Sequence, residues 1–118
     1  MRVLHVLNGL HAAGIESLAL ELISHSPAEV RAELLNTNRQ AQAQAPAFAE
    51  LQRSGKLAAI HQWRRCDGPV LAWRTFRLCR QRRPDALLIY PCNRPMLWLA
   101  LGARLAGVRR LAVAVQNT

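Results

Sequence analysis

Acidic residues are scarce in this sequence. It contains 7 Asp and Glu against 16 Lys and Arg, which gives a formal net charge of +9 at pH 7. The excess lies entirely in the second half, where eleven arginines face only Asp67 and Asp85. Such an imbalance favours an anionic partner, for example nucleic acid, an acidic lipid headgroup or a phosphorylated substrate. An arginine-rich solvated surface is the alternative explanation.

Cysteine is also rare. Cys66, Cys79 and Cys92 follow one another in equal steps of 13 residues. An odd number at this spacing matches neither a disulfide framework nor a set of zinc ligands. We therefore expect reduced thiols, a cytoplasmic protein and no metal site.

Long hydrophobic runs are missing. The longest, residues 96–103, has eight residues, far fewer than the roughly 20 that a membrane-spanning helix needs. The apolar run at residues 3–7 is too short for the core of a signal peptide. Any membrane contact is therefore expected to be peripheral. With 118 residues, 51% hydrophobic content and only 6 Gly and 6 Pro, the composition indicates one globular domain and excludes two full domains or a disordered chain.

Short β-type runs alternate with amphipathic helical ones along the chain. Strands are predicted at residues 2–7, 30–37, 57–63, 86–90 and 111–115. Helices are predicted at residues 15–25, 46–53, 69–82 and 95–106. This alternation predicts an α/β fold, a doubly wound (Rossmann-like) parallel sheet of about five strands in the order 3-2-1-4-5 with helices on both faces.

Ligands of such sheets bind beyond the carboxyl ends of the strands, where the strand order reverses. That point lies between the first and fourth predicted strands, so residues 8–14 and 91–95 are the segments of interest. The first opens onto a helix N-terminus, a natural anion site. Gly9 and Gly14 alone do not complete a dinucleotide fingerprint, and Ile15 and Glu16 replace the Lys and hydroxyl of a Walker A loop. Two interpretations of residues 8–14 remain: a loop of small residues that admits a ligand close to the main chain, or an ordinary tight turn.

Several segments resemble one family over the whole chain. They are Arg-Val-Leu-His-Val-Leu at 2–7, Ala-Gly-Ile-Glu at 13–16, Arg-Pro-Asp-Ala-Leu-Leu-Ile at 83–89, Ala-Arg-Leu-Ala-Gly-Val at 103–108 and Val-Gln-Asn-Thr at 115–118. In this order they resemble the N-terminal, acceptor-side domain of retaining GT-B glycosyltransferases of family 4, enzymes of polysaccharide biosynthesis. The resemblance implies transfer of a sugar from a nucleotide-sugar donor to a lipid- or polysaccharide-linked acceptor. It also implies that Ala13, Gly14 and Glu16 lie against the donor diphosphate, with Ala13 in place of the family's first Gly.

Two departures from the family limit what is expected of this chain. Gln116 stands at the position of the family's His, and an amide cannot titrate near pH 7, so no catalytic residue is assigned. The family's C-terminal domain, with the Glu-x7-Glu motif that holds the nucleotide sugar, is absent. We therefore expect residues 1–118 to be a single incomplete domain, inactive alone and without a cofactor, that meets the donor only when the missing C-terminal domain is supplied.

Other side chains are candidates for binding. His11, Tyr90, Asn93 and Arg94 belong to the two ligand-side segments and are predicted to contact the acceptor. His5, inside a predicted strand, is expected to be a satisfied core residue.

The predicted helix 69–82 places Trp73, Arg74, Arg77 and Arg80 on one side, a pattern suited to an anionic membrane surface. The resemblance implies that this surface would be the inner membrane face. A merely solvated face is the alternative. Nucleic acid is not expected, because no binding motif accompanies the charge. Two other functions stay open: a free-standing α/β binding module whose basic face docks on a membrane or partner, and a small flavodoxin-like nucleotide-binding protein.

Overall fold

The computed structural model describes residues 2–7, 14–27, 29–37, 45–64, 68–90 and 95–113. Strands and helices alternate in these segments: β1 (Arg2–Leu7), α1 (Gly14–Ser24), β2 (Arg31–Asn36), α2 (Ala45–Arg53), β3 (Leu57–Gln62), α3 (Pro69–Arg82), β4 (Ala86–Ile89), α4 (Pro95–Leu105) and β5 (Arg110–Val113). The sequence-based ranges agree with these bounds to within two residues.

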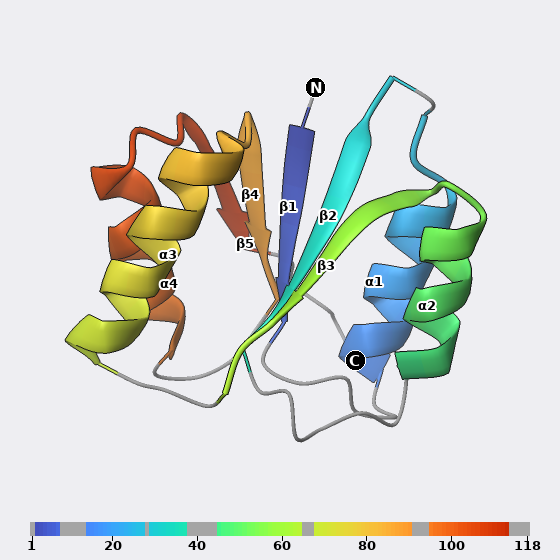
Figure 1. The fold of residues 1–118 in the computed structure, drawn as a ribbon, viewed down its shortest axis with the longest axis horizontal. Helices are drawn as coiled ribbons and strands as arrows, with labels where there is room; N and C mark the ends of the chain where they lie inside the picture. The colour runs from blue at the N-terminus through green and yellow to red at the C-terminus, as the bar shows by residue number, and fades with distance from the viewer. Residues whose placement is uncertain are drawn as a thin grey trace.

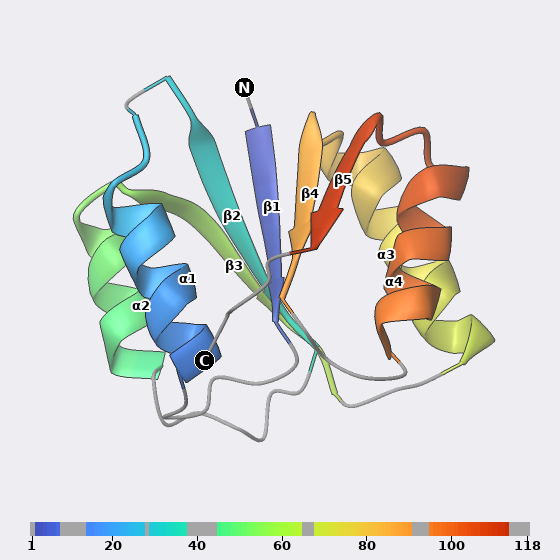
Figure 2. The ribbon, with the colours of Figure 1, turned by 180° about the vertical axis from the view of Figure 1, so that it is seen from behind.

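The strands form one parallel sheet in the order β3-β2-β1-β4-β5. Helices α1 and α2 cover one face, and α3 and α4 cover the other (Figures 1 and 2). The predicted doubly wound α/β fold and its strand order are therefore confirmed.

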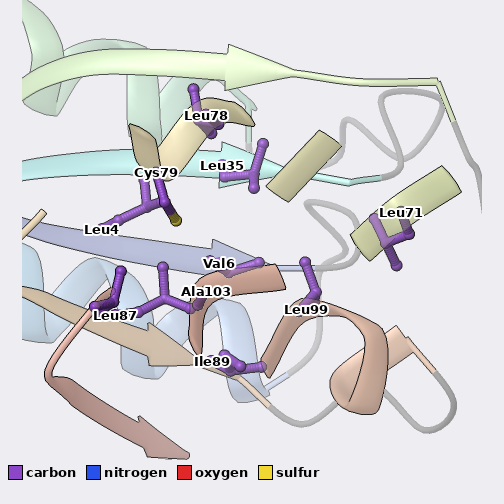
Figure 3. Packing of buried hydrophobic residues seen from close by; sticks show 11 residues of the cluster. Leu4, Val6, Leu35, Leu71, Leu78, Cys79, Leu87, Ile89, Leu99 and Ala103 are labelled. Atoms are coloured by element: carbon purple, nitrogen blue, oxygen red, sulfur yellow. The ribbon is translucent and has the colours of Figure 1, made fainter. Parts of the chain in front are cut away.

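Alternating side chains of the strands build two separate cores. Leu4 and Val6 of β1 point toward α3 and α4, whereas Leu7 joins the cluster beneath α1 and α2. Figure 3 shows the first cluster, in which strand residues meet Leu71, Leu78, Cys79, Leu99 and Ala103 of the two helices. Burial on both faces explains why the strands are near-continuous apolar runs.

Helices α3 and α4 approach each other closely at Gly102. A Cβ atom built there would overlap the carbonyl oxygen of Ala72 and lie 2.9 Å from Cβ of Thr75. The absence of a side chain at Gly102 therefore sets the distance between the helices of this layer.

A buried carboxylate of β2 connects the sheet to α3. Oε1 of Glu33 accepts a hydrogen bond from Nε of Arg82 at 2.8 Å and lies 3.1 Å from Nε2 of His61. The Glu33 side chain is only 4% exposed. Burial by itself raises the pKa of Glu33, but the hydrogen bonds and charges of Arg82 and His61 outweigh it and hold the pKa below its usual 4.5.

We expect Arg82→Met to lower the free energy of unfolding at pH 7 by about 2 kcal/mol, because it leaves a buried carboxylate with one partner. Urea unfolding followed by circular dichroism measures the loss. Arg77→Met, on the exposed side of the same helix, is the matched control and should cost less than about 0.5 kcal/mol. Equal losses in the two variants would contradict a structural role for this ion cluster.

Candidate functional site at the carboxyl edge of the sheet

The strand order reverses at β1, which pairs with β2 on one side and with β4 on the other. Val6 lies opposite Ile89, so β1 and β4 end side by side. From these ends the chain leads to α1 on one face of the sheet and to α4 on the opposite face (Figure 1). In doubly wound sheets this divergence opens the crevice in which ligands bind.

Main-chain hydrogen bonds fix the strand ends around this point. The carbonyl oxygen of Leu7 accepts hydrogen bonds from the N–H of Thr37 at 2.9 Å and from its hydroxyl at 3.2 Å. On the other side, the N–H of Tyr90 donates to the carbonyl oxygen of Val6 at 3.0 Å. The segments that leave Leu7 and Tyr90 therefore start from rigid positions.

Tyr90 points into the protein. It is 1% exposed, and its hydroxyl shares a hydrogen bond of 2.9 Å with Nδ1 of His5. The two rings stack with their centroids 5.9 Å apart. Burial lowers the pKa of His5 to about 4 and raises that of the Tyr90 hydroxyl. His5 was expected to be a satisfied core histidine, and this expectation is confirmed. Acceptor binding by Tyr90 stays a prediction, and the Tyr90 hydroxyl is already hydrogen-bonded to His5 in the protein interior.

The other candidates of the crevice are only partly placed. Gly14 is the first residue of α1 and Glu16 lies in its first turn, so the main chain here is a helix N-terminus at the carboxyl edge. The remaining candidates lie outside the described residues: His11, Ala13, Asn93, Arg94 and Gln116.

The basic side of α3 is exposed, as its helical periodicity predicts. Trp73 is 59% exposed and stacks on Phe76 at 5.7 Å. Arg74, Arg77 and Arg80 are also exposed, and the Arg80 guanidinium lies 6.0 Å from the centre of the Phe76 ring. The opposite side of the helix is buried through Leu71, Ala72, Thr75, Leu78 and Cys79.

The structure divides these arginines between two hollows. Arg74 and Arg77 line an open groove of about 500 Å³ beside Trp63 and Arg64, which follow β3. Arg80 belongs to a different cavity on the other flank of the helix. Sequence reasoning missed the groove, although Trp63 and Arg64 stand at the end of the predicted strand 57–63, a position that belongs to the carboxyl edge.

An apolar stripe accompanies the arginines on the helical layer of α3 and α4. Leu97, Leu101 and Leu105 recur every four residues along α4 and are 77%, 47% and 65% exposed. Leucines at this spacing lie on one face of a helix. Together with Trp73 they give this layer large apolar side chains that the described residues leave uncovered.

Within the described segments, no group of three His, Cys, Asp or Glu side chains is arranged to hold a metal ion. The described helices include none long and apolar enough to cross a membrane. Cys79 is a free buried thiol, and burial raises its pKa to about 11, whereas Cys66 and Cys92 lie outside the described residues.

No protein-family model matches this sequence, and no curated protein sequence matches it either. A functional assignment therefore depends on the chain's own residues and their geometry.

Proposed function

We propose that this chain is the acceptor-side part of a GT-B glycosyltransferase of family 4, which transfers a sugar from a nucleotide sugar to a lipid- or polysaccharide-linked acceptor. The observation that carries the proposal is the switch point at β1. There the chain from β1 enters α1 at Gly14, and β4 ends beside it. The family-like segments at 13–16 and 83–89 adjoin this crevice in the sequence.

Each part of the edge has a role in this proposal. The N-terminus of α1 offers unpaired N–H groups and a positive dipole end to the donor diphosphate, alongside Ala13, Gly14 and Glu16. His11, Asn93 and Arg94 contact the acceptor. The nucleotide sugar itself is held by a C-terminal domain, and Gln116 contributes a hydrogen bond near the reacting carbon but no proton transfer.

The groove beside β3 supports a negatively charged acceptor. Arg64, Arg74 and Arg77 surround it, and among the described residues none of the three has an ion-pair partner. Guanidinium groups bind phosphate in a bidentate manner. An acceptor linked to lipid through phosphate would therefore complement the groove.

Reading the gene beyond the codon for Thr118 tests the assignment. We expect the frame to encode further strands and helices and a Glu-x7-Glu motif. A stop codon followed by unrelated sequence would contradict the transferase and favour the binding module.

A second candidate function is a module that docks on an anionic membrane through the layer of α3 and α4. The observation that favours it is the combination on this layer of exposed Trp73 and the α4 leucine stripe with Arg74, Arg77 and Arg80. Exposed aromatic and aliphatic side chains enter the headgroup region, while arginines pair with acidic lipids.

For this surface we expect the double variant Arg74→Gln, Arg77→Gln to bind vesicles of phosphatidylglycerol at least tenfold more weakly, because each arginine near the membrane contributes about 1 kcal/mol. Co-sedimentation at low and physiological salt measures the partition coefficient. Arg31→Gln, Lys56→Gln makes the same change in net charge at exposed positions outside α3 and α4 and should lose less than threefold. Equal binding by the wild type and both double variants would contradict the proposal that this surface docks on membranes.

A further inference from the structure

A second basic hollow lies at the amino edge of the sheet, the edge opposite the candidate crevice. It has a volume of about 350 Å³ and lies between the C-terminal ends of α3 and α4. Its lining includes Cys79, Arg80, Arg83, Asp85, Gly107 and Arg109. Arg83 and Asp85 belong to the family-like segment 83–89 and Gly107 to the segment 103–108, but the resemblance assigns no ligand to this end of the molecule.

The charges around the cavity are not balanced. Arg80, Arg83 and Arg109 form no ion pair within the described part of the chain. Asp85 is the one acidic residue of the lining, and its Oδ2 already accepts a hydrogen bond from the main-chain N–H of Arg2 at 2.8 Å. The cavity therefore carries a net charge of about +2 from three cations and one anion.

Helix capping does not account for these arginines. The carbonyl oxygen of Cys79 accepts a hydrogen bond from the N–H of Arg83 at 2.8 Å, and that of Ala103 accepts one from the N–H of Val108 at 3.1 Å. Main-chain donors thus satisfy these two carbonyl groups, and the guanidinium of Arg2, which is not part of the lining, donates to the carbonyl oxygen of Arg82 at 2.9 Å. Within the described segments, Arg83 and Arg109 form no ion pair, and the Arg80 guanidinium lies beside the Phe76 ring.

Arg83 occupies this place at a conformational cost. Its φ of 48° and ψ of 59° are left-handed, and it is the one non-glycine residue with positive φ in the described segments. Glycine is the usual residue at such a helix end because it adopts this conformation without strain. A side chain kept in a strained position at the rim of a cavity indicates a use for that side chain.

We propose that the cavity binds a phosphate monoester through Arg80, Arg83 and Arg109. A monoester carries about −1.5 to −2 charges at pH 7, which matches the uncompensated charge of the lining. Guanidinium groups hold its oxygens in bidentate pairs. The volume admits the phosphate with a small organic group, so a soluble sugar or glycerol phosphate and the headgroup of a phosphomonoester lipid share the required chemistry.

Titration with glycerol 3-phosphate tests the site, with ¹H–¹⁵N spectra of the whole 118-residue chain as the readout and glycerol plus chloride at equal ionic strength as the blank. We expect saturable shifts of the amides of Arg83, Gly107 and Arg109 at millimolar ligand or below. No saturation, or equal shifts in the blank, would overturn the proposal.

Substitutions locate the binding and separate it from folding. Arg83→Gly removes the guanidinium while relieving the left-handed strain, so its thermal midpoint should stay or rise while the affinity falls at least tenfold. Arg109→Gln should weaken binding to a similar extent. Lys56→Gln, at an exposed position before β3 and outside both basic hollows, is the matched control and should stay within twofold. An equal loss in Lys56→Gln would overturn the proposal, because it would indicate general surface charge.

Vesicles distinguish the two sources of phosphate. Stronger co-sedimentation with phosphatidic acid than with phosphatidylglycerol, lost in Arg83→Gly, supports a lipid monoester as the ligand. Saturable glycerol 3-phosphate binding without that difference supports a soluble ester. If neither saturable glycerol 3-phosphate binding nor a preference for phosphatidic acid is found, the phosphate site is overturned. The proposed transferase function at the carboxyl edge would be unaffected by that result.

Discussion

Gly102→Val is expected to lower the free energy of unfolding by about 3 kcal/mol, at the upper end of the usual cost of overpacking. A Cβ at this position overlaps the carbonyl oxygen of Ala72 and comes within 2.9 Å of Cβ of Thr75. Main chain of α3 cannot rotate away as the tip of a side chain can, so the two helices must separate. Separation would loosen the packing of Leu71 and Leu99, both fully buried in the core beneath these helices (Figure 3).

Urea unfolding followed by circular dichroism measures this loss. Leu101→Val introduces the same β-branched residue in the same helix, at a position that is 47% exposed, and should cost less than about 1 kcal/mol. If both variants unfold at the same urea concentration, the close approach of α3 and α4 does not limit the packing of this layer.

Acid should destabilise the chain through His5 by about 3 kcal/mol between pH 6.5 and pH 4. Burial lowers the folded-state pKa of His5 from 6.5 to about 4, so the unfolded chain binds the proton more tightly. The stability is therefore complete above pH 6.5 and is lost as the pH falls toward 4. Each unit of pKa difference between the two states corresponds to about 1.4 kcal/mol.

Free energies of unfolding measured by urea at pH values from 7.5 to 4.5 check this dependence. The pKa of Glu33 is held below 4.5, so the stability that its carboxylate contributes is lost only at lower pH, where the group becomes protonated. The double variant His5→Leu, Tyr90→Phe removes both members of the buried hydrogen bond, and its stability should be nearly flat over the same range. A wild-type slope that persists unchanged in this variant would assign the acid sensitivity to other groups.

The fold could be predicted from the sequence because each element has a local signal. The run 2–7 is a mostly aliphatic strand, Pro69 stands at the start of α3 and Gly107 follows α4. The strand order was expected together with the fold class, because 3-2-1-4-5 is the common order of Rossmann-like doubly wound sheets. The exposed side of α3 followed from the 3.6-residue period, which separates Trp73 and its neighbouring arginines from the buried side of that helix.

The sites were harder to predict because they depend on contacts between distant segments. The direction of Tyr90 is set by a hydrogen bond to His5, 85 residues earlier in the chain. Glu33 is a charged residue inside a buried strand, and the positions of His61 and Arg82, 28 and 49 residues later in the chain, explain it. The division of the α3 arginines between two hollows depends on Arg64 and Arg109, which belong to other segments. Periodicity along one helix carries no information about such partners.

Sugar transfer by the complete product of the gene tests the central claim most directly. The product is incubated with membranes of its source cell and with labelled UDP-, GDP- or ADP-sugars, and label in the lipid or polysaccharide fraction is counted. We predict transfer from one of these donors, with a rise in the KM for the acceptor in Arg94→Gln. Absence of transfer from every donor, in a product that is folded and binds the same membranes, would contradict the assignment of this chain to a glycosyltransferase.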